Sequence, residues 1–344
     1  MIASISSKPN FVIILADDCS WYDLGCYGAT NNKTPNIDKL ASDGLLFSQA
    51  FNSATMCSPT RHSLYTGMYP IKNGGYANHS RVRDEVQSMP YYLGQLGYRV
   101  GIAGKLHIKP WENFPFEIIT GFPANQGEIR KIDPKKKYDG IAEFIGRNSQ
   151  QPFCMVVASV NPHVPWDTGD PSVYDPEILI LPPHIIDTRE TRESYSRYLA
   201  EVTLLDEETG KVMDILKEQG VYDNSLIFFL SEQGSQFVGN KWNVWNPGVH
   251  AGMIAVWNNI IKPGTSTNAL VQYEDILPTF IDLAGGKIPD SLDGFSMLGL
   301  LKGEKNVHRK YAFSLHHNIP EGSAYPIRSV TDGKYKLIWN LMSD

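Results

Sequence analysis

Short apolar runs alternate with helix-like segments along most of the chain, and this alternation constrains the fold more than any other feature. The runs are rich in Val, Ile and Phe, which is typical of strands buried on both faces of a parallel sheet, and they cover Phe11–Ala16, Arg99–Ala103, Phe153–Val160 and Ser225–Leu230. The helix-like segments cover Asn36–Asp43, Ser88–Leu96, Gly140–Arg147, Tyr195–Gln219 and Tyr273–Ala284, with Asn36 and Ser88 as expected caps. The pattern predicts an α/β fold in which helices flank a mostly parallel central sheet.

Each of these apolar runs ends in a polar cluster. In chain order the clusters are Asp17-Asp18, Gly104-Lys105-Leu106-His107, Asn161-Pro162-His163 and Glu232-Gln233. Ligands of open parallel sheets gather at the carboxyl ends of the strands. We therefore expect the four clusters to meet in one functional site, rimmed by a long proline-rich loop over residues 162–183.

The composition narrows the class of protein. With 344 residues, 42% of them hydrophobic, the chain can bury a large core and is long for one simple domain. Its formal net charge of -6 argues against a nucleic-acid binder or a polybasic membrane-surface protein. No apolar run has the length of a membrane span, and Met1–Pro9 lacks the features of a secretory signal. The compartment stays open: periplasmic, secreted or lysosomal if a leader was removed.

The cysteines do not indicate a zinc site or a disulfide scaffold. There are four, at positions 19, 26, 57 and 154, and they lack paired spacing. Both a bridge between Cys19 and Cys26 and a reduced pair fit the sequence. Cys57 taken alone fits a free core thiol, because unpaired cysteine is among the most buried residue types.

Cys57 opens the run Cys57-Ser58-Pro59-Thr60-Arg61. This run resembles the motif of the type I sulfatases of the alkaline phosphatase superfamily, in which such a cysteine is oxidised to formylglycine. The resemblance implies a hydrated aldehyde with one oxygen to attack sulfur and a second to expel the sulfate. Pro59 suits the first turn of a helix, so we expect the nucleophile at a helix N-terminus, which favours anions. So short a match occurs by chance in many chains, so the assignment depends on partner residues.

Asp17 and Asp18 are the strongest candidates for metal ligands. Adjacent carboxylates repel each other unless a cation lies between them, and oxygen ligands favour Ca²⁺ or Mg²⁺ over zinc. The resemblance implies that formylglycine 57 and a late acidic-amide pair complete the site, a place that Glu232 and Gln233 occupy. Here the chain departs from the family's Asp-Asn pattern by one methylene per side chain, so we expect one of the two to coordinate less directly. Either pair alone fits a helix cap or an exposed turn.

Basic residues complete the resemblance, since cleavage of a sulfate ester builds charge on the sulfonyl oxygens and on the leaving group. Arg61 lies one helical turn after Cys57 and is expected to hold the nucleophile and the metal-bound oxygens. The resemblance implies that Lys105 and Lys241 bind sulfate, that His107 binds the formylglycine hydroxyl and helps sulfate release, and that His163 protonates the leaving group. Any one of these is more often a surface charge or a structural histidine. Their conjunction in chain order favours a site.

Two segments resemble the sulfamidase branch, the N-sulfoglucosamine sulfohydrolases: 316–330, with His316 and His317, and 82–90. This implies cleavage of the N–S bond of a glucosamine N-sulfate in a heparan- or heparin-type saccharide, with His316 and His317 at the sugar. Further candidates for the sugar pocket are His79, Trp166, Trp242 and Trp245, although such residues pack in cores as often.

Three other interpretations stay open. A glycan O-sulfatase, for example one acting on 6-O-sulfate, shares the same core. A phosphodiesterase or phosphonate hydrolase of the superfamily uses the same fold. A noncatalytic sulfoglycan-binding protein follows if Cys57 stays unmodified or if activity needs the missing C-terminal part of the subdomain.

After Val307 the alternation of strand-like and helix-like segments gives way to strand-like runs alone. Strand-like runs at 311–315 and 325–339 surround Asp332-Gly333, which is a hairpin signal. We divide the chain into a catalytic domain over 1–306 and the start of a small antiparallel subdomain over 307–344, which we expect to be incomplete. The expected partners are a sulfated saccharide and a formylglycine-generating maturation enzyme, without nucleic acid.

Overall fold

A computed structural model describes residues 8–122, 138–148 and 150–342 of the chain. Within these residues, eight strands form one sheet in the order β5-β4-β6-β1-β7-β8-β2-β9. β4, β6, β1 and β7 run parallel, and β8 is antiparallel to both of its neighbours. The strands are β1 Asn10–Leu15, β2 Leu45–Phe47, β4 Arg99–Gly104, β5 Glu117–Ile119, β6 Phe153–Ala158, β7 Ser225–Leu230, β8 Met253–Val256 and β9 Thr265–Thr267. The prediction of a mostly parallel central sheet is confirmed.

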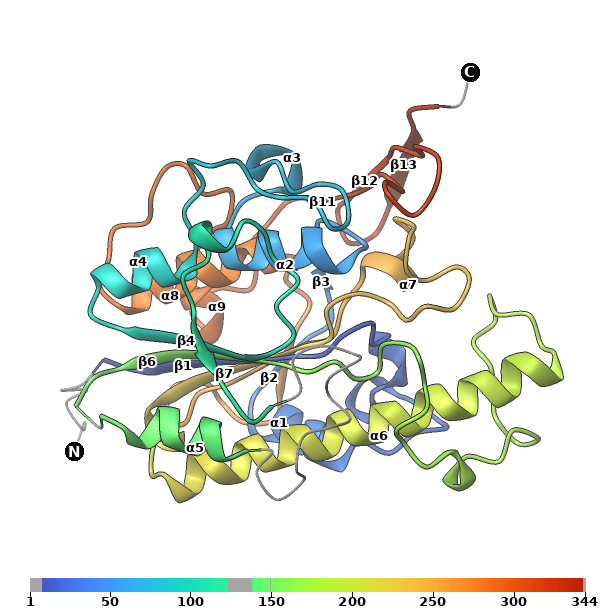
Figure 1. The fold of residues 1–344 in the computed structure, drawn as a ribbon, viewed down its shortest axis with the longest axis horizontal. Helices are drawn as coiled ribbons and strands as arrows, with labels where there is room; N and C mark the ends of the chain where they lie inside the picture. The colour runs from blue at the N-terminus through green and yellow to red at the C-terminus, as the bar shows by residue number, and fades with distance from the viewer. Residues whose placement is uncertain (1–7, 123–137, 149, 343–344) are drawn as a thin grey trace.

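Helices cover both faces of this sheet (Figure 1). One face carries α2 Cys57–Thr66, α4 Met89–Gln95, α8 Ile276–Leu283 and α9 Leu298–Leu301, and the other carries α1 Pro35–Asp43, α5 Asp139–Gly146 and α6 Arg189–Glu218. Successive side chains of a strand point to opposite faces. In β1, Phe11 and Ile13 therefore pack into the core under α2 and α8, and Val12 and Ile14 pack into the core over α6.

The predicted helix starts need two corrections. Asn36 is not the cap of α1, because the helix begins at Pro35; the Asp206 carboxylate of α6 instead accepts from the backbone N–H groups of Asn36 at 3.0 Å and Ile37 at 2.8 Å. The helix predicted from Tyr195 begins earlier, at Arg189. Hydrophobic periodicity reveals only the part of a helix that has an apolar face. In α6 that face starts where the helix reaches the core, so the exposed first part was not predicted.

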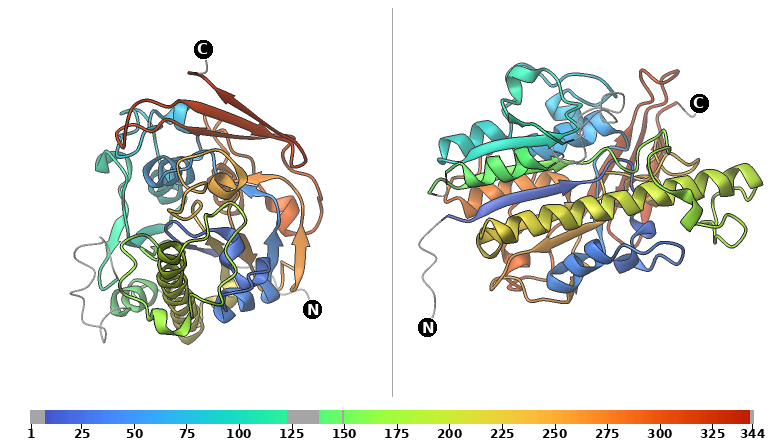
Figure 2. Two further views of the ribbon diagram at one scale, coloured as in Figure 1. Left: turned by 90° about the vertical axis from the view of Figure 1, so that its right-hand side faces the viewer. Right: turned by 60° about the horizontal axis from the view of Figure 1, so that its bottom comes forward.

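A second, antiparallel sheet closes the described chain. It contains β11 Ala312–His316, β12 Ile327–Thr331 and β13 Lys336–Asn340, and it lies at the edge of the molecule in the left view of Figure 2. The Asp332-Gly333 turn joins the last two strands, with Gly333 at a φ of 89° that suits glycine. The predicted antiparallel subdomain is therefore confirmed as a structure, and the division at residue 306 stays a prediction. The short elements β3 Ala50–Phe51, β10 Val271–Gln272, α3 Pro70–Asn73 and α7 Asn246–Val249 complete the fold.

Three remaining expectations concern cysteines, membrane spans and a secretory signal. All four cysteines are free thiols, so Cys19 and Cys26 form no bridge. Within the described ranges, no helix combines the length and the apolar character that a bilayer span requires. The third expectation, on Met1–Pro9, concerns a segment of which residues 1–7 lie outside the described residues.

Candidate active site

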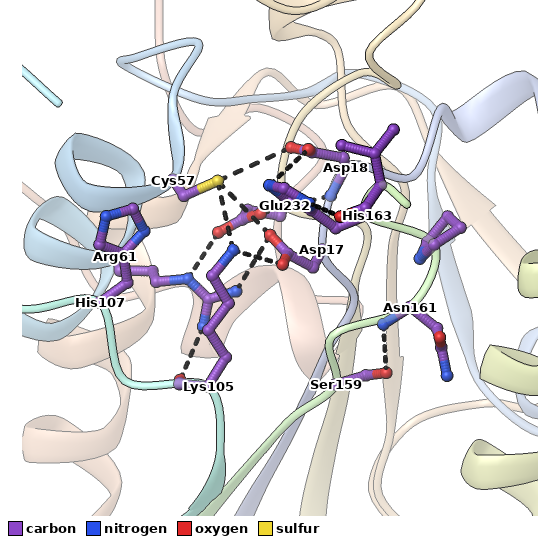
Figure 3. Close-up of polar contacts among 12 residues, drawn as sticks. Asp17, Asp18, Cys57, Arg61, Lys105, His107, Ser159, Asn161, His163 and Glu232 are labelled. Atoms are coloured by element: carbon purple, nitrogen blue, oxygen red, sulfur yellow. Dashed lines mark hydrogen bonds and ion pairs between the residues drawn. The ribbon is translucent and has the colours of Figure 1, made fainter. Parts of the chain in front are cut away.

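The polar clusters that follow the strands meet around Cys57 (Figure 3). β1, β4, β6 and β7 are parallel neighbours in the sheet, so their carboxyl ends share one edge. α2 begins at Cys57 beside this edge. The structure thus brings together the predicted residues Asp17, Asp18, Cys57, Arg61, Lys105, His107, His163, Glu232, Gln233 and Lys241.

Cys57 lies at the centre of the cluster and is 2% exposed. Its Sγ lies 3.4 Å from Lys241 Nζ, 3.7 Å from Lys105 Nζ, and 3.4 Å and 3.7 Å from one carboxylate oxygen each of Asp17 and Asp18. Burial raises the pKa of the thiol, but the two ammonium groups outweigh burial and lower the pKa to about 5. Position 57 therefore favours a group that carries or develops negative charge.

Asp17 and Asp18 are buried and each is paired with a different cation. Lys105 donates to Asp17, and Lys241 donates to Asp18 at 2.7 Å. Burial raises the pKa of both carboxyl groups. For Asp17, Lys105, His163 and Arg61 together outweigh burial and hold the pKa well below its usual value, whereas burial and Cys57 leave the pKa of Asp18 raised. Ligand atoms of Asp17, Asp18, Cys57 and His163 all lie within 4.8 Å of one another, close enough to hold one metal ion.

Glu232 and Gln233 contact each other, and each also has a partner of its own. The Glu232 carboxylate pairs with Arg61 Nε at 2.7 Å, and both side chains are fully buried. The Gln233 amide lies at the metal cluster, where Nε2 is 2.6 Å from Asp18 Oδ1 and 3.3 Å from Cys57 Sγ. Gln233 Oε1 is buried and has no hydrogen-bond partner among the described residues.

These residues fit a divalent cation. Two buried carboxylates, a terminal amide with an unsatisfied oxygen and the group at position 57 form a mainly oxygen-bearing set, which suits Ca²⁺ or Mg²⁺. Asp17, Asp18, Gln233 and position 57 are the residues that would hold it. Glu232 pairs with Arg61 through one carboxylate oxygen, and its other oxygen accepts from the Asp18 N–H at 3.4 Å and from Gln233 Nε2 at 3.2 Å. Which member of the late pair coordinates less directly stays a prediction.

Three residues that follow the strands have left-handed backbone conformations. Asp18 has a φ of 60°, Glu232 of 56° and His107 of 49°. Such conformations are sparsely populated by residues other than glycine and cost about 1–3 kcal/mol each when strained, so the surrounding structure must hold them in place. They turn the chain sharply at the strand ends and direct these side chains into the cluster.

The two catalytic histidine candidates lie in different electrostatic surroundings. Burial lowers the pKa of His163, but Asp18, whose Oδ2 lies 3.4 Å from Nε2, together with Asp17 and Cys57 outweighs burial, and the pKa is raised. For His107, burial and the cations Lys105 and Arg61 outweigh the weaker effect of Asp17 and lower the pKa to about 3. His163 therefore favours the protonated form and His107 the neutral form.

The predicted sugar-contacting residues differ in burial and in their contacts with the protein. His316 is 2% exposed, and its Nδ1 lies 3.2 Å from Thr55 Oγ1, whereas His317 is half-buried and packs against Tyr76 with ring centroids 5.2 Å apart. Trp166 stacks on Phe237 with centroids 4.8 Å apart. Their contacts with a sugar stay a prediction, as do the roles of the other site residues.

Asn78 and Glu321 lie next to the site and were missed by the sequence analysis. Asn78 donates to Glu321 and accepts from the backbone N–H of Ser58, directly after Cys57, at 3.4 Å. Neither residue follows a strand or belongs to a motif. The one sequence signal for Glu321 was its position within residues 316–330, the segment that resembles the sulfamidase branch. That resemblance gave no role to Glu321 itself.

Comparison with known proteins decides the family. The sulfatase family model matches residues 9–286. An ulvan-active sulfatase of Formosa agariphila is 35% identical over 347 residues, covering 99% of this chain and 68% of that relative. The chain belongs to the sulfatase family. This sulfatase is thus a hydrolase, and the family assignment made from the Cys57 motif is confirmed.

The resemblance to the sulfamidase branch is also confirmed. The family model described as the C-terminal part of N-sulphoglucosamine sulphohydrolase matches residues 236–343. Human N-sulphoglucosamine sulphohydrolase is 28% identical to this sulfatase, over 96% of this chain and 73% of its own length.

Solved structures support the same fold. A protein in complex with its substrate D-glucosamine-2-N,6-O-disulfate has a TM-score of 0.81 at 20% identity, covering 98% of this chain and 90% of its own. A phosphonate monoester hydrolase from Silicibacter pomeroyi has a TM-score of 0.75 at 19% identity, with the same two coverages of 98% and 90%. Both likenesses concern the fold alone.

Proposed function

We propose that this sulfatase removes sulfate from a sulfated glycan through a formylglycine made from Cys57 and a bound Ca²⁺, with Mg²⁺ as the alternative ion. The observation that carries the proposal is the position of Cys57 Sγ, within 3.7 Å of both Lys105 Nζ and Lys241 Nζ and of both aspartate carboxylates. Two fixed cations offset the charge of a sulfate at this position.

The residues around position 57 take complementary roles. Formylglycine supplies a hydrated aldehyde, with one oxygen for attack on sulfur and one for sulfate release. Lys105 and Lys241 stabilise the sulfonyl oxygens, and Asp17, Asp18 and Gln233 hold the cation. His163 carries a proton at Nε2 for the departing nitrogen or oxygen. Arg61 fixes the first turn of α2 through its NH1, which donates to the Lys105 carbonyl at 3.0 Å.

The favoured substrate is an N-sulfated glucosamine unit of a heparan- or heparin-type saccharide. Its support is the match of residues 236–343 to the C-terminal part of N-sulphoglucosamine sulphohydrolase. The competing substrate is a glycan O-sulfate. The 35% identical ulvan-active sulfatase of Formosa agariphila supports a sulfated glycan other than a heparan-type saccharide. A formylglycine-generating enzyme is the maturation partner that the proposal requires.

A panel of saccharides tests the proposal. Protein produced with a maturation enzyme is first analysed by intact mass for conversion of Cys57 to the aldehyde. Heparin, chondroitin and ulvan disaccharides bearing one sulfate each, and a phosphonate monoester, are then compared by kcat/KM. We expect sulfate release from the N-sulfated glucosamine to be fastest, and Cys57→Ala to abolish it without unfolding the protein. Faster phosphonate hydrolysis, or no turnover by the converted protein, would overturn the proposal.

A further inference from the structure

His107 makes one imidazole contact and leaves one nitrogen unsatisfied. Its Nε2 lies 2.7 Å from His79 Nδ1. Its Nδ1 is buried and has no hydrogen-bond partner among the described residues. Ser58 Oγ donates to the His107 carbonyl at 3.0 Å, which holds this residue at the start of α2, and Figure 3 shows its imidazole on the Cys57 side of the cluster. His107 thus contacts His79 through its ring and, through its carbonyl, Ser58, the residue after the nucleophile position.

His79 extends this contact to the surface. Its side chain is 55% exposed, and its Nε2 lies 3.7 Å from the Glu321 carboxylate and 3.3 Å from Asn78 Nδ2. The Asn78 backbone N–H donates to the Ile319 carbonyl at 3.0 Å, so the loop that carries His79 is tied to the segment that carries Glu321. The outer nitrogen of His79 therefore lies near a carboxylate and an amide, on a side chain that is open to solvent.

The ring of His107 has little capacity to hold a second proton. Burial, Lys105 and Arg61 lower the pKa of His107 to about 3, with Asp17 as the weaker opposing charge. His79 is exposed and has Glu321 beside it. A proton that reaches Nδ1 of His107 near neutral pH must therefore be matched by the loss of the proton at Nε2, because the doubly protonated ring is unfavourable there.

We propose that His79 is a proton-relay residue of this sulfatase, which takes the Nε2 proton of His107 as His107 takes a proton at Nδ1 from the hydroxyl at position 57. The inference rests on the proposed function. As sulfate leaves with the electrons of its C–O bond, the hydroxyl O–H electrons form the carbonyl. The hydroxyl proton moves to His107 Nδ1, the Nε2 proton moves to His79 Nδ1, and the proton of His79 Nε2 passes to water.

The relay also resets. After the Nε2 proton has left, Asn78 Nδ2 is placed to donate to that nitrogen, and both imidazoles are neutral in their other tautomers. When water adds to the carbonyl carbon, the carbonyl oxygen takes the proton of His107 Nδ1. His107 Nε2 recovers a proton from His79, which recovers one from solvent at Nε2, and the adding water releases one proton to solvent. The cycle thus begins and ends with the same protons.

Two variants separate a relay from simple positioning. His79→Gln retains a hydrogen-bonding group but cannot pass a proton from one atom to another, and His79→Ala opens space for added imidazole. With an aryl sulfate, we expect His79→Gln to keep the first burst of aryl alcohol while steady-state sulfate release falls at least about tenfold. Imidazole is expected to restore sulfate release in His79→Ala but not in His79→Gln. Asp84→Asn, at a side chain that is 86% exposed, is the matched control.

A measurement without turnover accompanies the kinetics. In protein whose Cys57 is unconverted, ¹⁵N shifts of the imidazoles report which nitrogen carries each proton, and we expect both nitrogens of His107 to shift in His79→Gln and neither in Asp84→Asn. Unchanged His107 shifts, normal sulfate release by His79→Gln, or loss of the burst without imidazole rescue would each overturn the relay. If wild-type protein releases no sulfate, the proposed function fails instead, and the ¹⁵N shifts still decide whether the rings share a proton.

Discussion

Arg61 shows how a single buried charge accounts for a departure from the family motif. Its side chain is fully buried, with Nε 2.7 Å from Glu232 and NH2 3.5 Å from Asp17. A buried guanidinium without a partner is strongly destabilising, so the cluster needs a carboxylate here. Glu232 reaches Arg61 and leaves Gln233 at the metal cluster. We interpret the Glu-Gln pair as a division between charge balance and coordination.

At the same scale, His163 should matter in proportion to the basicity of the leaving group. Because His163→Ala removes the proton donor, we expect kcat/KM for an amine or alcohol leaving group to fall by about 10²–10⁴, and far less for an activated aryl leaving group. A series of aryl sulfates with increasing leaving-group pKa measures this slope. Equal losses along the series would contradict a role as the acid.

His62 predicts a loss of stability in acid. Burial lowers its pKa from 6.5 to about 4, and its Nε2 accepts from the Lys109 backbone N–H at 3.1 Å. Between pH 6.5 and about 4, His62 is protonated in the unfolded chain but not in the folded protein. The contribution of neutral His62 to stability is therefore present above pH 6.5 and lost as the pH falls toward 4. This contribution is about 3 kcal/mol, at about 1.4 kcal/mol per pKa unit.

Urea unfolding at pH 7 and pH 5 tests this expectation. His62→Gln keeps an acceptor for Lys109 but does not titrate, so its stability should fall less between the two pH values than that of the wild type. The same variant made at the exposed His79 serves as the control. A pH dependence that His62→Gln leaves unchanged would show that other groups cause the acid loss.

At the scale of elements, the site exists because strand ends and helix starts coincide. The parallel register of β1 with β6 and β7 places residues 17, 161 and 232 side by side, and the backbone N–H of Asp17 donates to the Asn161 carbonyl at 3.0 Å. α2 then presents position 57 at its own N-terminus, where unpaired N–H groups favour an anion.

The pairing of α1 with α6 gives an element-level prediction. Asp206 accepts from the N–H groups of Asn36 and Ile37, and Gly210 permits close approach, since a Cβ there would lie 2.6 Å from Asn36 Oδ1. Asp206→Ala leaves buried donors unsatisfied and should destabilise the protein by about 1–3 kcal/mol. Asp206→Asn, which keeps one acceptor, should cost less.

Hydrogen exchange localises this effect. In Asp206→Ala, faster exchange should be confined to the first turn of α1, because the rest of the helix keeps its own hydrogen bonds. Exchange that rises equally across the central sheet would show a global loss of stability instead of the loss of this cap.

At the scale of the whole molecule, buried charges join the antiparallel sheet to the catalytic core. Arg309, just before β11, pairs with Asp275 before α8, with Nε 2.7 Å from Oδ2 and NH2 bonded to Oδ1. The Asp275 carboxylate is fully buried. This bidentate pair and the Ser314 Oγ hydrogen bond to the Asn52 carbonyl, at 2.6 Å, hold β11 near the loop that leads to position 57.

Cation binding should stabilise the whole fold. An ion at Asp17 and Asp18 offsets their repulsion only in the folded protein, so free Ca²⁺ at about 100 times its Kd should add about 2.7 kcal/mol of stability. We expect a chelator to lower the Tm, Ca²⁺ to restore it, and Asp18→Asn to reduce the response, with exposed Asp84→Asn as the control. The same Tm with and without Ca²⁺ would contradict a metal at this site.

The sequence by itself determined the alternating architecture, the strand ends that carry polar clusters and the nucleophile motif, because periodicity and motifs are local properties of the chain. Tertiary structure alone decided which partner each buried charge takes. Glu232 pairs with Arg61 through one oxygen and contacts Asp18 and Gln233 through the other. Asn78, His79 and Glu321 meet beside His107, although 242 residues separate His79 from Glu321 in the chain. Such pairings depend on burial and on distances across the fold, which no local pattern encodes.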